Sequence, residues 1–253
     1  MIGTIIGGLS VAMKALDLIS NNVANAKTYG FKTSSMNFQD VYQQDGIPSR
    51  RVGEGAKLAA SNLRHDVQGS LTLTGNVLDL AIKGAGFFLV NDAATGAVKY
   101  TRDGSFLLDA NGFIVNGSGH FLRSIDGKAI QIPRQSQGNF LADLTVDGQG
   151  RVIATYEGQK PVTIASIALA VFPKPGALTP EGRGNFSATL QSGQAKIGAA
   201  SSDGYGSVQS GALENSTSDI VKEMTRMIAA QQSFSANAKM LQTHNDMTAR
   251  WVK

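Results

Sequence analysis

The chain of 253 residues contains no cysteine. Disulfide frameworks, thiol nucleophiles and thiolate metal sites are therefore excluded. Its three histidines, His65, His120 and His244, lie far apart, and none stands at metal-ligand spacing. A Gly-x-Ser-x-Gly nucleophile motif is also missing. The sequence therefore predicts a protein that is not an enzyme and that holds no cofactor and no metal.

Charge is also scarce, since only 17% of the residues are charged and the formal net charge is +4. Lysine and arginine are scattered along the chain, and no basic arm or aromatic-rich strand motif accompanies them, so we expect no nucleic-acid partner. Near the N-terminus, Lys14 and Asp17 interrupt the apolar run. A membrane span needs about twenty mostly apolar residues, so we expect no membrane insertion.

Both ends of the chain carry helical patterns of apolar residues. The N-terminal stripe recurs at spacings of three and four, and the C-terminal one has the heptad spacing of a coiled coil. Gln231 and Asn245 interrupt the C-terminal seam: buried amides there would specify the register, whereas amides that face solvent would only be polar surface. Ser216 and Asp219 offer a capping box to start this helix. The stripes consist of Ile2, Ile6, Leu9, Met13, Leu16, Ile19 and Val23, and of Ile220, Met224, Met227, Gln231, Phe234, Ala238, Leu241, Asn245, Thr248 and Val252.

Two such helices can cover each other or the same stripes on neighbouring copies; the plainer alternative is a helical pair packed on its own domain. We predict an α+β protein whose N- and C-terminal helices pair as a coiled-coil stalk. The middle favours an antiparallel β domain, either a sandwich or a partly open barrel. The expected domains are an N-terminal helix (1–31), an extended connector (32–65), the central β domain (66–205), and a return connector with the C-terminal helix (206–253).

Within the β domain, turn signals separate the expected strands. Asn111-Gly112 and Gly148-Gln149-Gly150 are strong hairpin signals, and each lies in a similar strand-turn-strand stretch. A unit of this kind therefore occurs twice. The expected strands are 78–82, 87–90, 105–108, 113–115, 129–132, 144–146, 151–156 and 162–172.

Four ordered stretches resemble a known family. Residues 20–32 (SNNVANAKTYGFK) closely resemble the N-terminal signature of the bacterial flagellar rod and hook protein family. Gln68-Gly69 with residues 74–88 resembles its central block, and residues 100–106 (YTRDGSF) continue it. Residues 211–231 are similar to its C-terminal signature. The resemblance covers nearly the whole chain.

This resemblance implies a structural axial subunit of the basal-body rod, located in the flagellar basal body and spanning the periplasm. Such a subunit is exported unfolded by the flagellar type III apparatus, without a cleaved signal, and is polymerised into a helical tube that transmits torque. The implied partners are further copies, other rod and hook subunits, the export apparatus and the surrounding basal-body ring proteins. Gly3, Gly7 and Gly8 each weaken the isolated first helix by about 1 kcal/mol relative to alanine, which suits folding that awaits a partner.

The residues expected at the assembly interface are Ile6, Leu9, Met13, Leu16, Asn21, Asn22, Asn25, Tyr29, Phe31, Leu213, Asp219, Met224, Met227, Gln231, Phe234 and Leu241. The amides of Asn21 and Asn25 lie one turn apart, where they bind either a neighbour or the helix's own last carbonyls.

Several alternatives stay open. The absence of an additional outer domain and the short segment 38–63 favour a proximal rod protein, while a short hook protein or a distal rod protein is the alternative within the family. Outside the family, a carbohydrate-binding or hydrolytic β domain would need paired carboxylates at a cleft. A soluble adaptor would use its helices for a different partner and form no filament.

Overall fold

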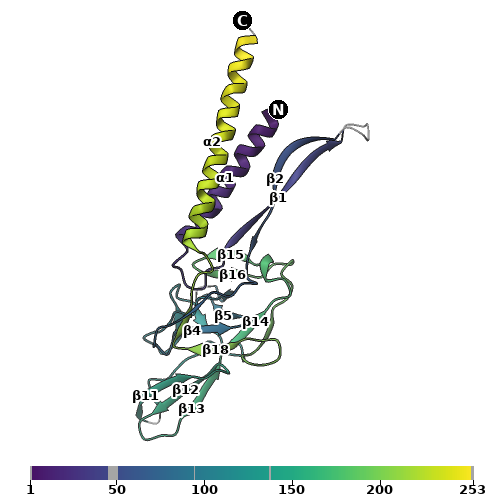
Figure 1. Ribbon diagram of the computed structural model, residues 1–253. Coiled ribbons are helices and arrows are strands. Elements are labelled where there is room, and N and C mark those ends of the chain that lie inside the picture. The colour runs from purple at the N-terminus through teal and green to yellow at the C-terminus, as the bar shows by residue number, and fades with distance from the viewer. Residues whose placement is uncertain (1, 45–50, 94, 137, 252–253) are drawn as a thin grey trace. The chain divides into compact units, whose positions relative to one another are not determined.

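The computed structural model describes residues 2–44, 51–93, 95–136 and 138–251 (Figure 1). The chain forms two compact units, each of which gathers separate segments. We call the first the helical unit; it comprises Met1–Ala26, Thr33–Arg64 and Ser218–Lys253. The second, which we call the β unit, comprises Lys27–Lys32 and His65–Thr217.

The helical unit contains two long helices, α1 (Ile2–Ala24) and α2 (Ile220–Trp251). They run in opposite directions, because Asn22 bonds to Glu223 while Gly8 lies beside Asn237 (Figure 1). Strands β1 (Ser34–Gln44) and β2 (Arg51–Leu63) form an antiparallel hairpin that contacts α1. The expected connector at 32–65 is therefore corrected to a paired hairpin, apart from residues 45–50, which lie outside the described part.

Helix α2 begins at a side-chain cap. The Asp219 Oδ1 atom accepts hydrogen bonds from the backbone N–H groups of Val221 (2.9 Å) and Lys222 (3.3 Å). A carboxylate in this position satisfies N–H groups that have no partner within the helix. The first turn also contains Glu223, whose charge suits the positive end of the helix. The N-cap is thus Asp219 itself, and the expected capping box starting at Ser216 is wrong.

Strands of the β unit pair in an antiparallel manner throughout the described residues. Nine of them form one sheet with the order β15-β16-β6-β5-β9-β8-β7; β14 also pairs with β5, and β17 pairs with β14. A second sheet has the order β10-β11-β12-β13, and β18–β4 and β19–β3 form separate pairs.

The bounds of these strands are β3 Leu71–Leu73, β4 Leu80–Lys83, β5 Phe87–Asn91, β6 Val98–Thr101, β7 Phe106–Leu108, β8 Ile114–Asn116, β9 Phe121–Leu122, β10 Gln135–Ser136, β11 Asn139–Val146, β12 Arg151–Tyr156, β13 Val162–Ser166, β14 Ala168–Val171, β15 Thr179–Gly182, β16 Asn185–Ser187, β17 Lys196–Ala199, β18 Ser207–Ser210 and β19 Ala212–Glu214. A short 3-10 helix, η1 (Pro175–Ala177), precedes β15.

The hydrophobic core of the β unit is assembled from most of these strands. Phe88 and Phe106 are fully buried and pack edge to face, with ring centroids 5.3 Å apart. Full burial of one such side chain contributes about 1.5–3 kcal/mol. The β unit therefore has a core of its own. Further core members are Leu80, Ile82, Val90, Ile114, Leu122, Ile130, Ile132, Val152, Ile167 and Leu169.

The strand-turn-strand repeat that the sequence predicts is confirmed. In one copy the Gly112 N–H donates to the Asp109 carbonyl, and in the other the Gly150 N–H donates to the Asp147 carbonyl, each at 2.9 Å. Both glycines have positive φ angles, 80° and 74°, which a side chain would strain. The same turn recurs at residues 116–119 and 124–127, where the sequence analysis did not identify it.

The α+β class is confirmed: N- and C-terminal helices pack together, and the central region consists of antiparallel sheets. Three of the expected segments differ from the observed ones. The long strand expected at 162–172 is divided at Ile167 into β13 and β14. Residues 206–214, expected to be part of a return connector, form β18 and β19, which pair with β4 and β3 inside the β unit. Residues 129–132 make isolated bridges instead of a strand.

Candidate assembly site

On the α1 side, most residues at the contact with α2 are small. On α1 the residues that are buried or half-buried at alternating steps of three and four include Gly8, Ala12, Ala15 and Ile19. A Cβ atom added to Gly8 would lie 2.9 Å from the Asn237 side-chain nitrogen, so the glycine allows α2 to approach closely. The facing residues of α2 keep the heptad spacing of a coiled coil. They are Glu223, Met227, Ala230, Phe234, Asn237, Leu241 and His244.

This seam differs from the expected one. Met227, Phe234 and Leu241 belong to both, but Met224, Gln231 and Asn245 are exposed, and Val252 lies outside the described residues. Of the two roles considered for Gln231 and Asn245, polar surface is therefore the one observed within the chain. An amide does stand in the seam, but it belongs to Asn237.

A buried polar cluster closes the end of the helical unit where α1 finishes. Asn22 is fully buried; its Nδ2 donates to the Ser34 carbonyl (3.0 Å) and to Glu223 Oε2 (3.4 Å). In return, the Ser34 N–H donates to Asn22 Oδ1 (3.1 Å), and the Ser218 hydroxyl donates to the Asn22 carbonyl (2.8 Å). The Glu223 carboxylate also pairs with Arg226 at 2.7 Å. Asn22 thus joins α1, β1 and α2 within one chain, so its side chain is not free for a neighbour.

The amide of Asn25 acts within its own helix. Its Nδ2 donates to the Asn21 carbonyl at 2.9 Å, and Asn21 itself is exposed. Of the two roles considered for this pair, bonding to the helix's own last carbonyls is therefore the one observed. The Asn21 carbonyl also accepts from the Asn25 backbone N–H at 3.1 Å, so the side chain adds a second hydrogen bond to this oxygen at the end of the helix.

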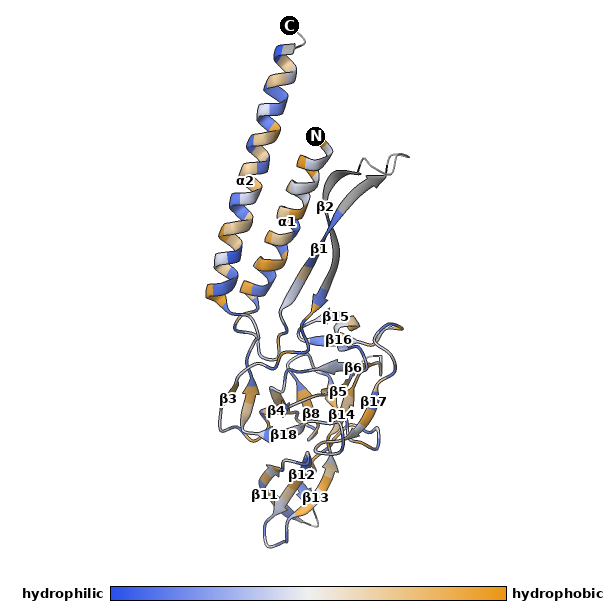
Figure 2. Cartoon of the chain, turned by 45° about the vertical axis from the view of Figure 1, so that its right-hand side comes forward, coloured by the Kyte–Doolittle hydropathy of each residue, from blue (hydrophilic) through white to orange (hydrophobic). Residues whose placement is uncertain are grey.

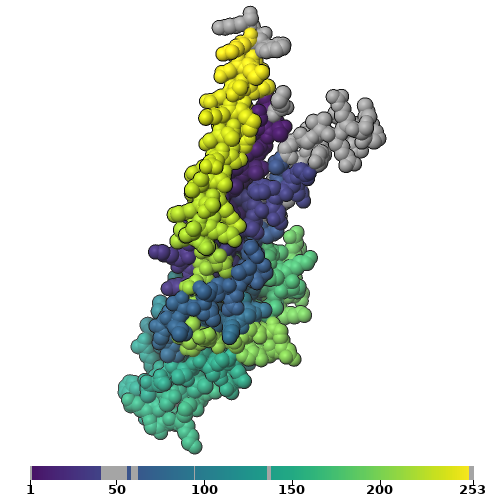
Figure 3. Space-filling view, viewed as in Figure 1, coloured from purple at the N-terminus to yellow at the C-terminus, as the bar shows by residue number. Residues whose placement is uncertain are grey.

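The faces of α1 and α2 that turn away from each other retain large apolar side chains. On α1, Ile2, Ile6 and Met13 are exposed, and hydrophobic residues recur along the whole helix (Figure 2). On α2, the exposed large apolar residues among those described are Ile220, Val221, Met224, Ile228, Met240 and Met247. Figure 3 shows the two helices side by side, with α2 presenting a long surface. A soluble monomer rarely keeps a continuous apolar surface without a partner.

The expected interface residues fall into three classes. Leu213 and Asn22 are buried inside their own units, so neither is accessible to a partner. Leu213 lies in β19, opposite Thr72. Seven others are half-buried: Leu9, Leu16, Asn25, Phe31, Met227, Phe234 and Leu241. The remaining seven are exposed: Ile6, Met13, Asn21, Tyr29, Asp219, Met224 and Gln231.

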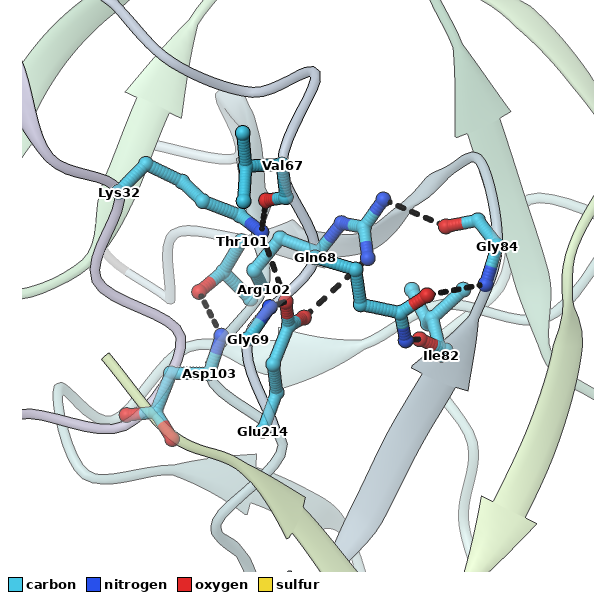
Figure 4. Close-up of polar contacts among 10 residues, drawn as sticks. All are labelled: Lys32, Val67, Gln68, Gly69, Ile82, Gly84, Thr101, Arg102, Asp103 and Glu214. Carbon is cyan, nitrogen blue, oxygen red and sulfur yellow. Dashed lines mark hydrogen bonds and ion pairs between the residues drawn. The ribbon is translucent and has the colours of Figure 1, made fainter. Parts of the chain in front are cut away.

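The β unit contains a buried ionic cluster that the sequence analysis missed. Glu214, in β19, accepts from Lys32 Nζ at 2.7 Å and from Arg102 Nη1 at 3.2 Å, and all three side chains are at most 5% exposed (Figure 4). Glu214 Oε1 also accepts from the Gly69 N–H at 2.8 Å, and Lys32 donates to the Val67 carbonyl at 2.7 Å. Lys32 and Glu214 are 182 residues apart. The cluster therefore ties the segment before the hairpin to the last strand of the unit.

Two cations share this one carboxylate, and burial governs their ionisation. Burial lowers the pKa of Lys32, and the Glu214 carboxylate offsets part of that effect. The pKa of Arg102 is lowered for the same reason. The Arg102 guanidinium lies 5.3 Å from the Phe87 ring centroid and donates to the Gly84 carbonyl at 2.8 Å. Such a cluster stabilises the fold only while the carboxylate is present, because unpaired buried charges are costly.

His65 stands next to this cluster between two aromatic rings. Its ring centroid is 5.2 Å from that of Phe87 and 4.9 Å from that of Phe186, both edge to face. Among the described residues, neither ring nitrogen has a hydrogen-bond partner. Burial, helped by the charges of Lys32 and Arg102, lowers the pKa of His65 to about 4. The imidazole is therefore neutral near pH 7 and acts as a packing group.

A metal site and a membrane span each place requirements on the described residues of the two units. In the part of the chain that the structure describes, no three histidine, aspartate or glutamate side chains are grouped so that they could hold a metal ion. By length and composition alone, α1 could cross a membrane. Lys14 and Asp17 thus do not exclude a span as the sequence analysis expected. A single helix of this kind is weak evidence for a span, because core helices share the same composition.

Comparisons with known proteins agree with the helical termini and the antiparallel body. Residues 2–32 match the family model described as flagella basal body rod protein. Residues 81–154 match that of the flagellar hook protein FlgE/F/G D1 domain, and residues 209–251 match that of the flagellar basal body rod FlgEFG protein C-terminal region.

Near full-length similarity to curated proteins extends these matches. The chain is 31% identical to the flagellar basal-body rod protein FlgG of Bacillus subtilis over 98% of its length and 96% of that protein. It is 34% identical to FlgG of Caulobacter vibrioides over 96% of its length and 95% of that protein. The flagellar hook protein FlgE of Escherichia coli is 40% identical over 45% of the chain and 27% of the hook protein. The chain therefore belongs to the flagellar basal-body rod protein family, whose members are non-enzymatic structural subunits of the flagellar axis.

Proposed function

We propose that this chain is exported by the flagellar type III apparatus and polymerises into the helical tube of the rod, where it transmits torque from the motor. Its partners are further copies and other rod and hook subunits, with the basal-body ring proteins around them. The finished subunit lies in the basal body and spans the periplasm. The preference for the proximal part of the rod stays a prediction, because the names of the relatives give no position along the rod.

The observation that carries this proposal is the apolar surface left on the paired helices. Ile6 and Met13 on α1, and Met224 and Ile228 on α2, are exposed although they are large and apolar. Identical subunits that bury such surfaces against one another by a rotation that does not close form a filament. An axial subunit needs this property, and an enzyme or a ligand-binding domain does not.

The direct test is to locate the chain. Basal bodies are purified from cells in which the gene is intact and from cells in which it is deleted, and the chain is detected by mass spectrometry. We expect the chain in intact basal bodies, and rods that are truncated or missing in the deletion strain, which should be non-motile. A motile deletion strain with complete rods would contradict the proposal.

Met224→Asp tests the surface itself. A carboxylate at this exposed apolar position would have to be buried without a partner at an assembled interface, at a cost of several kcal/mol. We expect no rod and no motility, while the circular dichroism of the β unit stays that of the wild type. Met224→Leu keeps the apolar surface and should assemble normally. A motile Met224→Asp strain with normal rods would show that this surface is not used.

A hook subunit is the second candidate. It is favoured by the 40% identity to the hook protein FlgE over 114 residues. The same fractionation distinguishes the two, because a hook subunit leaves the preparation when hooks are sheared from the basal bodies, whereas a rod subunit stays.

A further inference from the structure

A groove crosses the helical unit where β1 passes the two helices. It has a volume of about 300 Å³ and a mainly apolar lining that includes Leu18 and Ile19 of α1, Met36 and Phe38 of β1, and Arg226 and Ala230 of α2. Among the described residues of its wall, the one acidic group is Glu223, which is already paired with Arg226 and bonded to Asn22. An apolar occupant would therefore meet no carboxylate without a partner.

The opposite face of α2 carries three apolar side chains in a row. Val221, Met224 and Ile228 are 75%, 51% and 56% exposed. Each precedes a residue of the groove wall by two positions, namely Glu223, Arg226 and Ala230. Two residues turn an α-helix by about 200°. The apolar row and the groove thus point in opposite directions, so one copy cannot fill its own groove with its own row.

We infer that Val221, Met224 and Ile228 of one copy fill the groove of the next copy along the assembly. This contact rests on the proposed rod function and specifies its subunit interface. A row on one face and a groove on the other make a head-to-tail contact, which repeats without closing when the rotation between copies does not close. At about 30 Å³ per water-sized group, the groove holds roughly ten such groups, about as many as the three side chains contribute.

The same chain supplies both halves of this contact, which argues for a second copy over an unrelated partner. The row is apolar and the groove lining is largely apolar, with its carboxylate already paired inside the chain. Phe38, which lines the groove, is itself 48% exposed and would become more buried when a second copy fills the groove. The contact also explains why α2 keeps an apolar row that plays no part in the seam with α1.

Engineered cysteines provide the test, because the chain has no cysteine of its own. In Ser35→Cys/Thr225→Cys, one thiol lies at the groove and the other lies beside the apolar row on the opposite face of α2. A disulfide needs Cα atoms within about 7 Å, so only a contact between copies can join these thiols. Basal bodies purified from this strain are treated with a mild oxidant and analysed on a non-reducing gel. We expect a ladder of dimers, trimers and longer species.

Ser35→Cys/Gln242→Cys is the matched control. Gln242 is exposed and follows Thr225 by 17 positions, which places it about 25 Å further along α2. This variant should give no ladder. A second variant, Ile228→Ser, should reduce the number of copies per basal body at least about tenfold, since it removes one buried apolar side chain from every contact.

The outcomes separate this contact from the function on which it rests. A chain that never enters basal bodies would overturn the proposed function and the contact with it. A chain that enters basal bodies but gives no ladder, or an equally strong ladder in the control, would overturn the contact alone. A ladder confined to the Thr225 pair would support it.

Discussion

The two units of this chain differ in how completely they bury their apolar residues. In the β unit, residues such as Phe88, Phe106 and Ile167 are fully buried in a common core. In the helical unit, only Ala12 and Ile19 are buried apolar residues among those described, and larger ones remain exposed. Stability follows the apolar area removed from water, so the β unit should be stable alone. The helical unit leaves part of its apolar surface exposed, as expected of a region that is buried by neighbouring subunits.

The largest expected difference concerns local stability in the monomer. Hydrogen exchange of the purified full-length chain should give opening free energies near the global value, of order 5–15 kcal/mol, for β5, β8 and β14. Amides of α1 and α2 should open at a small fraction of that cost. Limited proteolysis should accordingly leave a fragment close to residues 65–217. Equal protection of both units from hydrogen exchange would show that the helices are already stable in the monomer.

Removal of the buried carboxylate should be the most damaging single change in the β unit. Glu214→Gln leaves Lys32 and Arg102 buried without an anion, which should lower the free energy of unfolding by about 3–5 kcal/mol. Glu181→Gln is the matched control, since Glu181 makes a partly exposed pair with Lys99 at 3.3 Å. Its loss should cost less than about 1 kcal/mol. Urea titration of both variants checks this; similar midpoints for the two would argue against an essential role of the cluster.

Lowering the pH should destabilise the folded chain through the protonation of His65. Its pKa is about 4 in the folded chain and near 6.5 when unfolded, so the unfolded state binds the proton more readily. The stability that depends on the neutral ring is complete above pH 6.5 and is lost as the pH falls from 6.5 towards 4, by up to about 3 kcal/mol. His65→Leu should remove this loss relative to the wild type, whereas His244→Leu, in α2, should not change it. Urea titrations at pH 7 and pH 4.5 measure both, and parallel losses in all three proteins would exclude His65 as the cause.

The sequence predicted the class of each unit better than it predicted their contacts. Turns such as Asp109–Gly112 depend on a few adjacent residues, so their signal is local and was correctly interpreted. The ionic cluster joins Lys32 to Glu214 across 182 residues, and no local pattern indicates such a pair. The pairing of 34–44 with 51–63 could not be predicted either, because these two segments carry no sustained alternation of apolar and polar residues.

The seam between the helices illustrates a further limit of prediction from hydrophobic periodicity. Hydrophobic periodicity finds large apolar residues, and it correctly located a stripe containing Ile6 and Met13 on α1. The structure places smaller residues, Gly8, Ala12 and Ala15, toward α2, because small side chains let two helices approach closely. The predicted stripe is therefore real, but much of it is the surface that the chain leaves uncovered.

The smallest expected effect is a difference in helix stability between alanine substitutions at two glycines of α1. Alanine is favoured over glycine in a helix by about 1 kcal/mol. A Cβ atom at Gly3 would meet nothing within 4 Å, so Gly3→Ala should stabilise α1 by nearly this amount. At Gly8 the added Cβ would press on Asn237, at 2.9 Å, so the gain should be cancelled in part or in full. Hydrogen exchange of α1 amides in both variants measures the difference. If the two substitutions stabilise α1 equally, the close approach at Gly8 does not limit packing, and the low stability of α1 comes from helix propensity alone.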